Sequence, residues 1–226
     1  MLIHNILNLF FPKLCGACSK LVIRSHNELC LKCELNLIDE ARPDSIIIKK
    51  VLRGRADIER GAFFLDFKKR EETQKILHSI KYQNQKKLGI YISEQLSLKL
   101  NTDFFEGIDC VIPVPLHPKK LKLRGFNQSS LIARGIHNTK HIPIDFDHLK
   151  RIKNTSSQTN KNSLERWENV KSAFKVINAN AFQGKHILLV DDVFTTGATL
   201  ETCVNTIQKQ AKCKCSILTI ARASKN

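Results

Sequence analysis

The residues best suited to chemistry in this 226-residue chain stand within nine consecutive positions near its C-terminal end. Asp191 and Asp192 follow a short apolar run, Ile187 to Val190, which is typical of a strand buried on both faces of a parallel sheet. A turn of small and hydroxyl-bearing residues comes next: Thr195, Thr196, Gly197, Ala198 and Thr199. Apolar residues at helical spacing begin at Leu200, so the turn should lead into a helix.

This arrangement predicts a site for a phosphorylated sugar. Backbone N–H groups at a helix start, together with threonine hydroxyls, can surround a phosphate, and Gly197 lets the backbone approach closely. Two carboxylates nearby can accept hydrogen bonds from both hydroxyls of a ribose or approach a divalent cation. Helix capping explains one such acid or threonine, but not two acids and three threonines in nine positions. Neither G-x-x-x-x-G-K-[ST] nor G-x-G-x-x-G is present, which disfavours the common nucleotide-binding folds.

The sequence V-D-D-V-F-T-T-G-A-T-L resembles the phosphoribosyl pyrophosphate (PRPP) loop of type I phosphoribosyltransferases. The resemblance implies an α/β fold, with a parallel sheet flanked by helices, and Mg²⁺ that binds together with PRPP. It also implies roles for individual residues. Asp191 and Asp192 would contact the ribose hydroxyls, and the residues from Thr195 to Thr199 would hold the 5′-phosphate.

Two C-x-x-C pairs near the N-terminus predict a structural zinc site. The four ligands are Cys15, Cys18, Cys30 and Cys33. Two such pairs can give four thiolates to one tetrahedral ion, which leaves no open position for catalysis. Disulfides are the alternative, but we expect a cytoplasmic chain without a signal peptide, where thiols stay reduced. We therefore expect a helix and a small zinc module in residues 1–40, followed by a phosphoribosyltransferase-like domain in residues 41–226.

The chain is strongly basic, with a net charge of +16. Residues 117–175 hold 13 Lys and Arg against 4 Asp and Glu. Such a field favours polyanions or phosphorylated ligands, although a basic surface can also serve solubility alone. Seven residues in this part are candidates for contacts to pyrophosphate or to a DNA backbone. They are Lys119, Lys120, Lys122, Arg124, Arg151, Lys153 and Arg166.

These basic residues stand in two segments that we interpret as loops. The first leaves a predicted strand and leads into a helix, where it is well placed for phosphate oxygens. The second contains a polar stretch, residues 154–163, which could close over a charged ligand. A solvated surface loop is the alternative for both segments. Trp167 should pack beneath the second loop.

Hydrophobic patterns predict alternating strands and helices in the rest of the chain. We expect strands at residues 62–67, 110–114, 187–190 and 215–220, and helices at residues 71–80, 88–100 and from 200 onward. Lys81 and Tyr82 should form a turn. The apolar residues 1–11 are too few to span a bilayer, which needs about 20, so we expect an amphipathic helix docked on the body. Contact with the inner membrane surface is the alternative, without stable insertion.

Several motifs together resemble the ComF family. They are the paired C-x-x-C start, Lys81-Tyr82, P-V-P-L-H-P-K-K-L-K-L-R-G-F-N-Q, R-I-K-N-T-S-S-Q, R-W-E-N-V and the PRPP loop. The resemblance implies a role in natural transformation, in which single-stranded DNA is handled in the cytoplasm together with DNA-uptake machinery. Some relatives carry names linked to gluconate uptake, which leaves the process open.

Two functions follow from these observations. In the first, a PRPP site is retained and the basic face binds single-stranded DNA. In the alternative, an active Mg²⁺-dependent transferase moves ribose 5-phosphate from PRPP to a nitrogenous acceptor. No general base and no nucleobase pocket can be identified from the residues, so we assign no catalytic residue.

Overall fold

The computed structural model describes residues 13–22, 28–40, 46–66, 71–82, 84–153 and 173–223. The predicted N-terminal helix, the polar stretch at 154–163, Arg166 and Trp167 lie outside the described residues. Within the described part, no helix combines the length and the apolar character needed to cross a bilayer.

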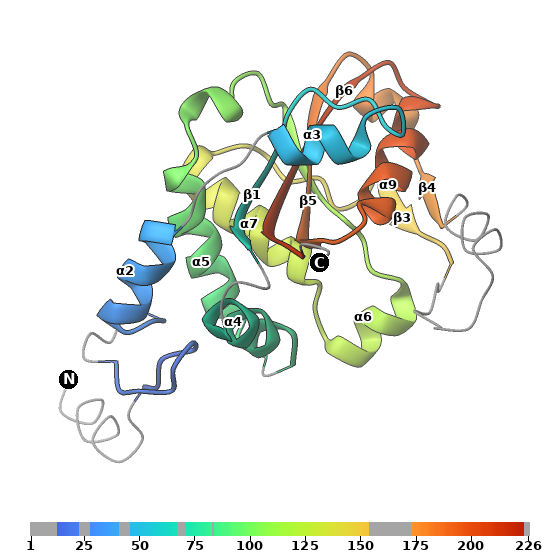
Figure 1. Ribbon diagram of the computed structural model, residues 1–226. Coiled ribbons are helices and arrows are strands. Elements are labelled where there is room, and N and C mark those ends of the chain that lie inside the picture. The colour runs from blue at the N-terminus through green and yellow to red at the C-terminus, as the bar shows by residue number, and fades with distance from the viewer. Residues whose placement is uncertain are drawn as a thin grey trace.

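A four-stranded parallel sheet with the order β1-β6-β5-β2 forms the centre of the molecule (Figure 1). The strands are β1 (Gly61–Asp66), β2 (Cys110–Pro113), β5 (His186–Phe194) and β6 (Lys214–Arg222). In the interior strand β5, the run predicted to be buried on both faces is fully inaccessible: Leu188 and Leu189 are both 0% exposed. The parallel order and the two-sided burial confirm the α/β class.

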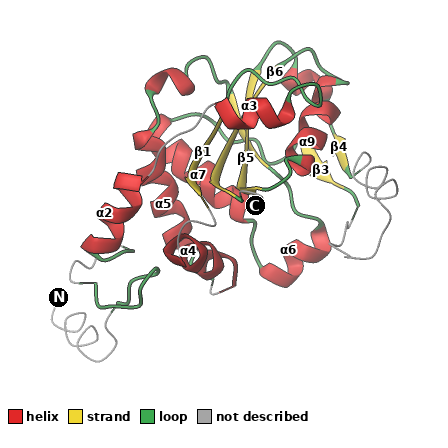
Figure 2. Cartoon of the chain, viewed as in Figure 1, coloured by secondary structure: helices red, strands yellow, loops and turns green. Residues whose placement is uncertain are grey.

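Helices cover both faces of this sheet (Figure 2). The α-helices among the described residues are α2 (Leu31–Glu40), α3 (Ile46–Leu52), α4 (Glu71–Tyr82), α5 (Lys86–Lys99), α6 (Pro118–Arg124), α7 (Gln128–Lys140) and α9 (Ala198–Gln208). Leu188 and Val190 point into one core with α4, α5 and α7, whereas Ile187 and Leu189 point into the other with α3 and α9. Successive residues of a strand face opposite sides, so the apolar run supplies both cores.

Smaller elements complete the fold. An antiparallel hairpin of β3 (Leu149–Arg151) and β4 (Phe174–Val176) packs beside α9. Two short 3₁₀ helices are η1 (Thr102–Phe104) and η2 (Ala179–Phe182). The four-cysteine module shares the α5 core, because Cys15 and Leu88 belong to the same buried cluster.

The observed elements correct three sequence predictions. Lys81 and Tyr82 form the last turn of α4 rather than a separate turn. Strand β5 continues through both acidic residues to Phe194, so the carboxylates stand within the strand end. The first basic segment is the helix α6, because Pro118 occupies its first turn and Gly125, at φ +76°, ends it in the left-handed conformation.

Candidate functional site

The turn between β5 and α9 is exposed and shaped by one glycine. Thr195 and Thr196 are exposed, and Gly197 adopts a φ of +76° just before the first helical residue, Ala198. A Cβ atom at position 197 would lie 2.8 Å from Phe194 Cζ, so the glycine is required for space as well as for conformation. The Ala198 N–H donates to Thr196 Oγ1 at 3.4 Å. The remaining N–H groups of the first turn of α9 precede the intrahelical ladder and can face an anion.

Arg55, which follows α3 in the first third of the chain, contacts this turn. Its guanidinium donates to the Thr196 carbonyl oxygen at 3.1 Å and forms an ion pair with Glu201 of α9. The guanidinium therefore lies beside the predicted phosphate position, with its charge partly balanced by Glu201. The sequence prediction missed Arg55, because the turn that it contacts lies 141 residues away and no local motif marks it.

The two carboxylates are bound by different helices. Asp191 Oδ1 accepts a hydrogen bond from Ser129 Oγ of α7 at 2.9 Å and another from the Asp192 N–H at 3.0 Å. Asp192 Oδ2 lies 2.7 Å from Nζ of Lys81, in the last turn of α4. The acidic pair is therefore the point at which β5, α4 and α7 meet.

Partial burial at the end of β5 makes Asp191 an unusual carboxyl group. It raises the pKa of Asp191 to about 7, and the neighbouring charge of Asp192 adds to the effect. Hydrogen bonds from Ser129 and the Asp192 N–H, together with the charge of Lys81, oppose this rise. Near neutral pH, Asp191 can therefore accept or release a proton.

Three of the predicted basic residues form a group beside the acidic pair, which we call the basic cluster: Lys120, Arg124 and Arg151. Burial lowers the pKa of Lys120, and the charges of Arg151 and Arg124 lower it further. Burial also lowers the pKa of Arg151, which the charge of Asp191 opposes. The Arg151 guanidinium lies over the Phe174 ring, 5.3 Å from its centroid. The cluster therefore brings concentrated positive charge close to Asp191.

The other predicted basic residues stand apart or cannot be placed. Lys119, Lys122 and Lys153 are exposed. Arg166 lies outside the described residues. A further polar group was missed by the sequence analysis: the buried Gln128 side chain accepts from Arg124 at 3.1 Å, but its Nε2 has no hydrogen-bond partner. Gln128 lines a cavity of about 10 Å³ with Lys81 and Asp192, which is close to the volume that one water molecule needs.

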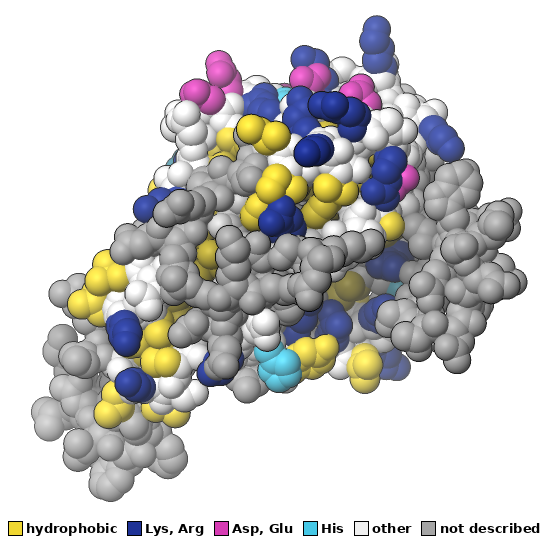
Figure 3. All heavy atoms as spheres, in the orientation of Figure 1, with side chains coloured by type: hydrophobic (Ala, Val, Ile, Leu, Met, Phe, Trp, Pro, Cys, Tyr) yellow, Lys and Arg dark blue, Asp and Glu magenta, His cyan; other side chains and the backbone are white. Residues whose placement is uncertain are grey.

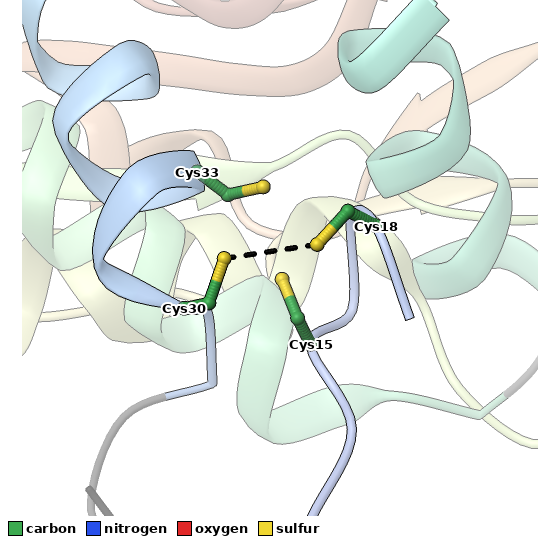
Figure 4. A group of neighbouring side chains, drawn as sticks. All are labelled: Cys15, Cys18, Cys30 and Cys33. Atoms are coloured by element: carbon green, nitrogen blue, oxygen red, sulfur yellow. Dashed lines mark hydrogen bonds between the residues drawn. The ribbon is translucent and has the colours of Figure 1, made fainter. Parts of the chain in front are cut away.

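The four cysteines fit a tetrahedral metal ion. Their sulfur atoms all lie within 4.8 Å of one another and point toward a common centre (Figure 4). Cys18 Sγ and Cys30 Sγ are 3.7 Å apart, close to the roughly 3.8 Å expected for two thiolates on one tetrahedral zinc ion with Zn–S bonds of about 2.3 Å. Cys30 immediately precedes α2, and Cys33 belongs to its first turn. The donor set fits structural zinc, which would tie α2 to the preceding turn.

Replacing Asp191 by asparagine should change how stability depends on pH. The pKa of Asp191 is about 7 in the folded chain, against about 3.9 in an unfolded chain. The folded state therefore binds more protons between about pH 4 and 7, so its stability falls as pH rises through that range. We expect the melting temperature of Asp191→Asn to exceed that of the original chain by several degrees near pH 8, and to match it near pH 4.5.

Thermal unfolding followed by circular dichroism at both pH values measures this difference. Asp145→Asn is a control in which the change in stability near pH 8 should have the opposite sign. Burial raises the pKa of Asp145, but hydrogen bonds from the His148 and Asp147 N–H groups lower it by more. That variant should be less stable than the original chain near pH 8. The same change in melting temperature at both pH values for Asp191→Asn would contradict the prediction.

Known proteins with similar sequences are named for competence or for DNA utilization. Competence protein F of Haemophilus influenzae is 29% identical over 153 residues, which cover 66% of this chain and 67% of that protein. DNA utilization protein YhgH of Escherichia coli (strain K12) is 26% identical over 83% of this chain and 80% of that protein. Competence protein ComFC of Bacillus subtilis is 33% identical, over 45% of this chain and 39% of that protein. No protein-family model matches the chain.

Solved structures with some similarity are phosphoribosyltransferases. A hypoxanthine phosphoribosyltransferase from Staphylococcus aureus aligns with 61% of this chain and 64% of that chain, at 18% identity and a TM-score of 0.36. An adenine phosphoribosyltransferase from Leishmania tarentolae aligns with 89% of this chain and 90% of that chain, at 11% identity and a TM-score of 0.37.

Proposed function

Because this chain belongs to the ComF family, we propose that it acts in DNA uptake during natural transformation, handling incoming single-stranded DNA in the cytoplasm and binding PRPP. The names of its relatives, competence protein and DNA utilization protein, support the process. The main observation in favour of PRPP is the turn from Thr195 to Thr199, which follows two carboxylates and in which Thr195 and Thr196 are exposed.

The parts of PRPP match the charges around this turn. The 5-phosphate would meet the first-turn N–H groups of α9, the threonine hydroxyls and the positive charge of Arg55. The ribose hydroxyls would donate to Asp191 and Asp192, and the pyrophosphate would extend toward the basic cluster. When bound, Mg²⁺ would supply charge neutralisation at the pyrophosphate.

The basic surface supports the DNA part of the proposal. The chain carries a net charge of +16, and Lys and Arg outnumber Asp and Glu on the face shown in Figure 3. The phosphates of a single strand release counterions when they bind such a surface, which favours association at low salt. The basic cluster lies close to the sugar site, so a strand and a sugar phosphate would be neighbours.

Loss of the Thr196 hydroxyl or of the Asp192 charge should weaken PRPP binding. We expect roughly fivefold weaker binding for Thr196→Ala, since a hydrogen bond is worth about 1 kcal/mol. For Asp192→Asn we expect a loss of more than about tenfold, since hydrogen bonds to charged groups are worth about 1.5–3 kcal/mol. Calorimetry with PRPP and Mg²⁺ measures both. Thr206→Ala, at the far end of α9, is the matched control and should bind PRPP as tightly as the original chain does. Equal affinity of the original chain and all three variants would contradict a PRPP site at this turn.

DNA binding should depend steeply on salt. The logarithm of the affinity for an oligonucleotide should fall with the logarithm of salt concentration, by about 0.7 for each phosphate neutralised. Arg124→Gln should make this slope shallower by about 0.7, because one contact is lost. Lys209→Gln changes the net charge equally, at the far end of α9, and should leave the slope unchanged. A flat salt response of the original chain would remove the DNA part of the proposal.

A transferase is the second candidate function, and the raised pKa of Asp191 favours it. Asp191 and Asp192 would hold the ribose hydroxyls while positive charge builds at the anomeric carbon. The pyrophosphate would leave toward the basic cluster. A carboxylate with a pKa of about 7 is also suited to take a proton from a nitrogen nucleophile.

Pyrophosphate release from PRPP tests this candidate directly. We expect release with at least one member of a panel of purine and pyrimidine bases, and its loss in Asp191→Asn, because the proton acceptor is gone. The assay follows pyrophosphate over time in the presence of Mg²⁺, with the Thr206→Ala variant as control. If the protein binds PRPP but releases pyrophosphate with none of the bases, the transferase function is contradicted and only the binding function stays.

A further inference from the structure

A groove of about 810 Å³ separates the four-cysteine module from α4. One wall comes from the module, at residues 14–17 and Ser19, and the other comes from α4, between Gln74 and Tyr82, together with Gln85. The module and α4 lie next to each other in the fold (Figure 1). The volume is within the range of ligand sites, about 300–1,000 Å³. The zinc ligand Cys15 and Lys81, the partner of Asp192, are among the residues that line the groove.

An exposed aromatic ring stands at the edge of the groove. The side chain of Tyr82 is 66% exposed, although tyrosine usually buries most of its ring. The ring of His78 lies 4.7 Å from the ring of Tyr82, and the Arg124 guanidinium lies 6.0 Å from its centroid. The second tyrosine, Tyr91, instead donates a hydrogen bond to Glu34. Tyr82 is therefore placed to stack on a flat ligand rather than to fill a core.

The remaining walls combine apolar and cationic groups. Leu14, Ala17 and Leu77 supply apolar surface, and Lys75 and Lys81 supply positive charge. Among the described residues that line the groove, none is Asp or Glu. A flat ring held by stacking, with a phosphate held by lysine, is the chemistry that such walls favour.

Lys81 connects the groove to the sugar site. It lines the groove, and its Nζ lies 2.7 Å from Asp192 Oδ2. Arg124 makes a second connection, because it lies over Tyr82 and also belongs to the basic cluster. A strand whose bases enter the groove would therefore have its phosphates beside charges already described.

We propose that this groove binds the unstacked bases of single-stranded DNA, with Tyr82 as the stacking platform and Lys75 and Lys81 beside the phosphates. The proposal rests on the proposed function and gives the strand a specific location. Duplex DNA does not meet the same requirement, because its bases are stacked and paired. Stacking of a base on an aromatic side chain is sequence-tolerant, as an incoming strand of any sequence requires.

Two oligonucleotides and three variants test this location. The first is a fluorescent oligothymidylate of about 12 nucleotides, within the usual range of site sizes. The second has the same length and phosphates but only abasic sugars. We expect the original chain to prefer the first. Tyr82→Ala should weaken oligothymidylate binding roughly tenfold while leaving the abasic strand unchanged. Tyr82→Phe should keep the preference, and so should Phe146→Ala, which removes an exposed ring outside the groove.

A second measurement uses the unmodified protein and so does not depend on whether a variant folds. Oligothymidylate carrying 5-iodouracil should crosslink under ultraviolet light to residues 74–85, identified by mass spectrometry. Equal binding of both oligonucleotides by the original chain, or crosslinks confined to other segments, would overturn the groove and leave a phosphate-only mode of DNA binding. Absence of binding to either oligonucleotide would overturn the proposed DNA function itself.

Discussion

Two adjacent carboxylates at the end of a buried strand cannot both be charged without partners. In this chain the partners come from separate helices: Ser129 of α7 donates to Asp191, and Lys81 of α4 pairs with Asp192. Partial loss of such a network leaves a buried charge uncompensated, which costs more than the network gains when it is intact. The positions of α4 and α7 against the sheet are therefore tied to the chemistry of the site.

The turn beside the two carboxylates is also held in place before any ligand binds. Gly197 shapes the turn, and Arg55 holds it through the Thr196 carbonyl. The turn that we propose as the phosphate site is thus held by α9 on one side and by the segment after α3 on the other. Preorganised donors stabilise a charged ligand without the cost of ordering them at the moment of binding.

The sequence was sufficient for features that depend on local patterns. The uninterrupted apolar run from Ile187 to Val190 was enough to predict a strand buried on both faces. The paired C-x-x-C spacings were enough to predict the four-cysteine cluster. The helix α6 was wrongly expected to be a loop, although Pro118 at its start and Gly125 at its end were usable signals. Arg55, Ser129 and the groove had no such signal, because each depends on residues far apart in the chain. The expected roles of the PRPP-loop residues and the division at residue 40 stay predictions.

The pairing of Lys81 with Asp192 has a thermodynamic consequence. The Lys81 ammonium group pairs with Asp192, the proposed ribose contact, and also lines the groove proposed for single-stranded DNA. Any ligand that draws this group to one side changes the free energy of binding on the other. Linkage makes the effect mutual: the factor by which a bound strand alters affinity for the sugar phosphate equals the factor by which the sugar phosphate alters affinity for the strand. In the proposed function, the sugar phosphate would in this way regulate how firmly the strand is held.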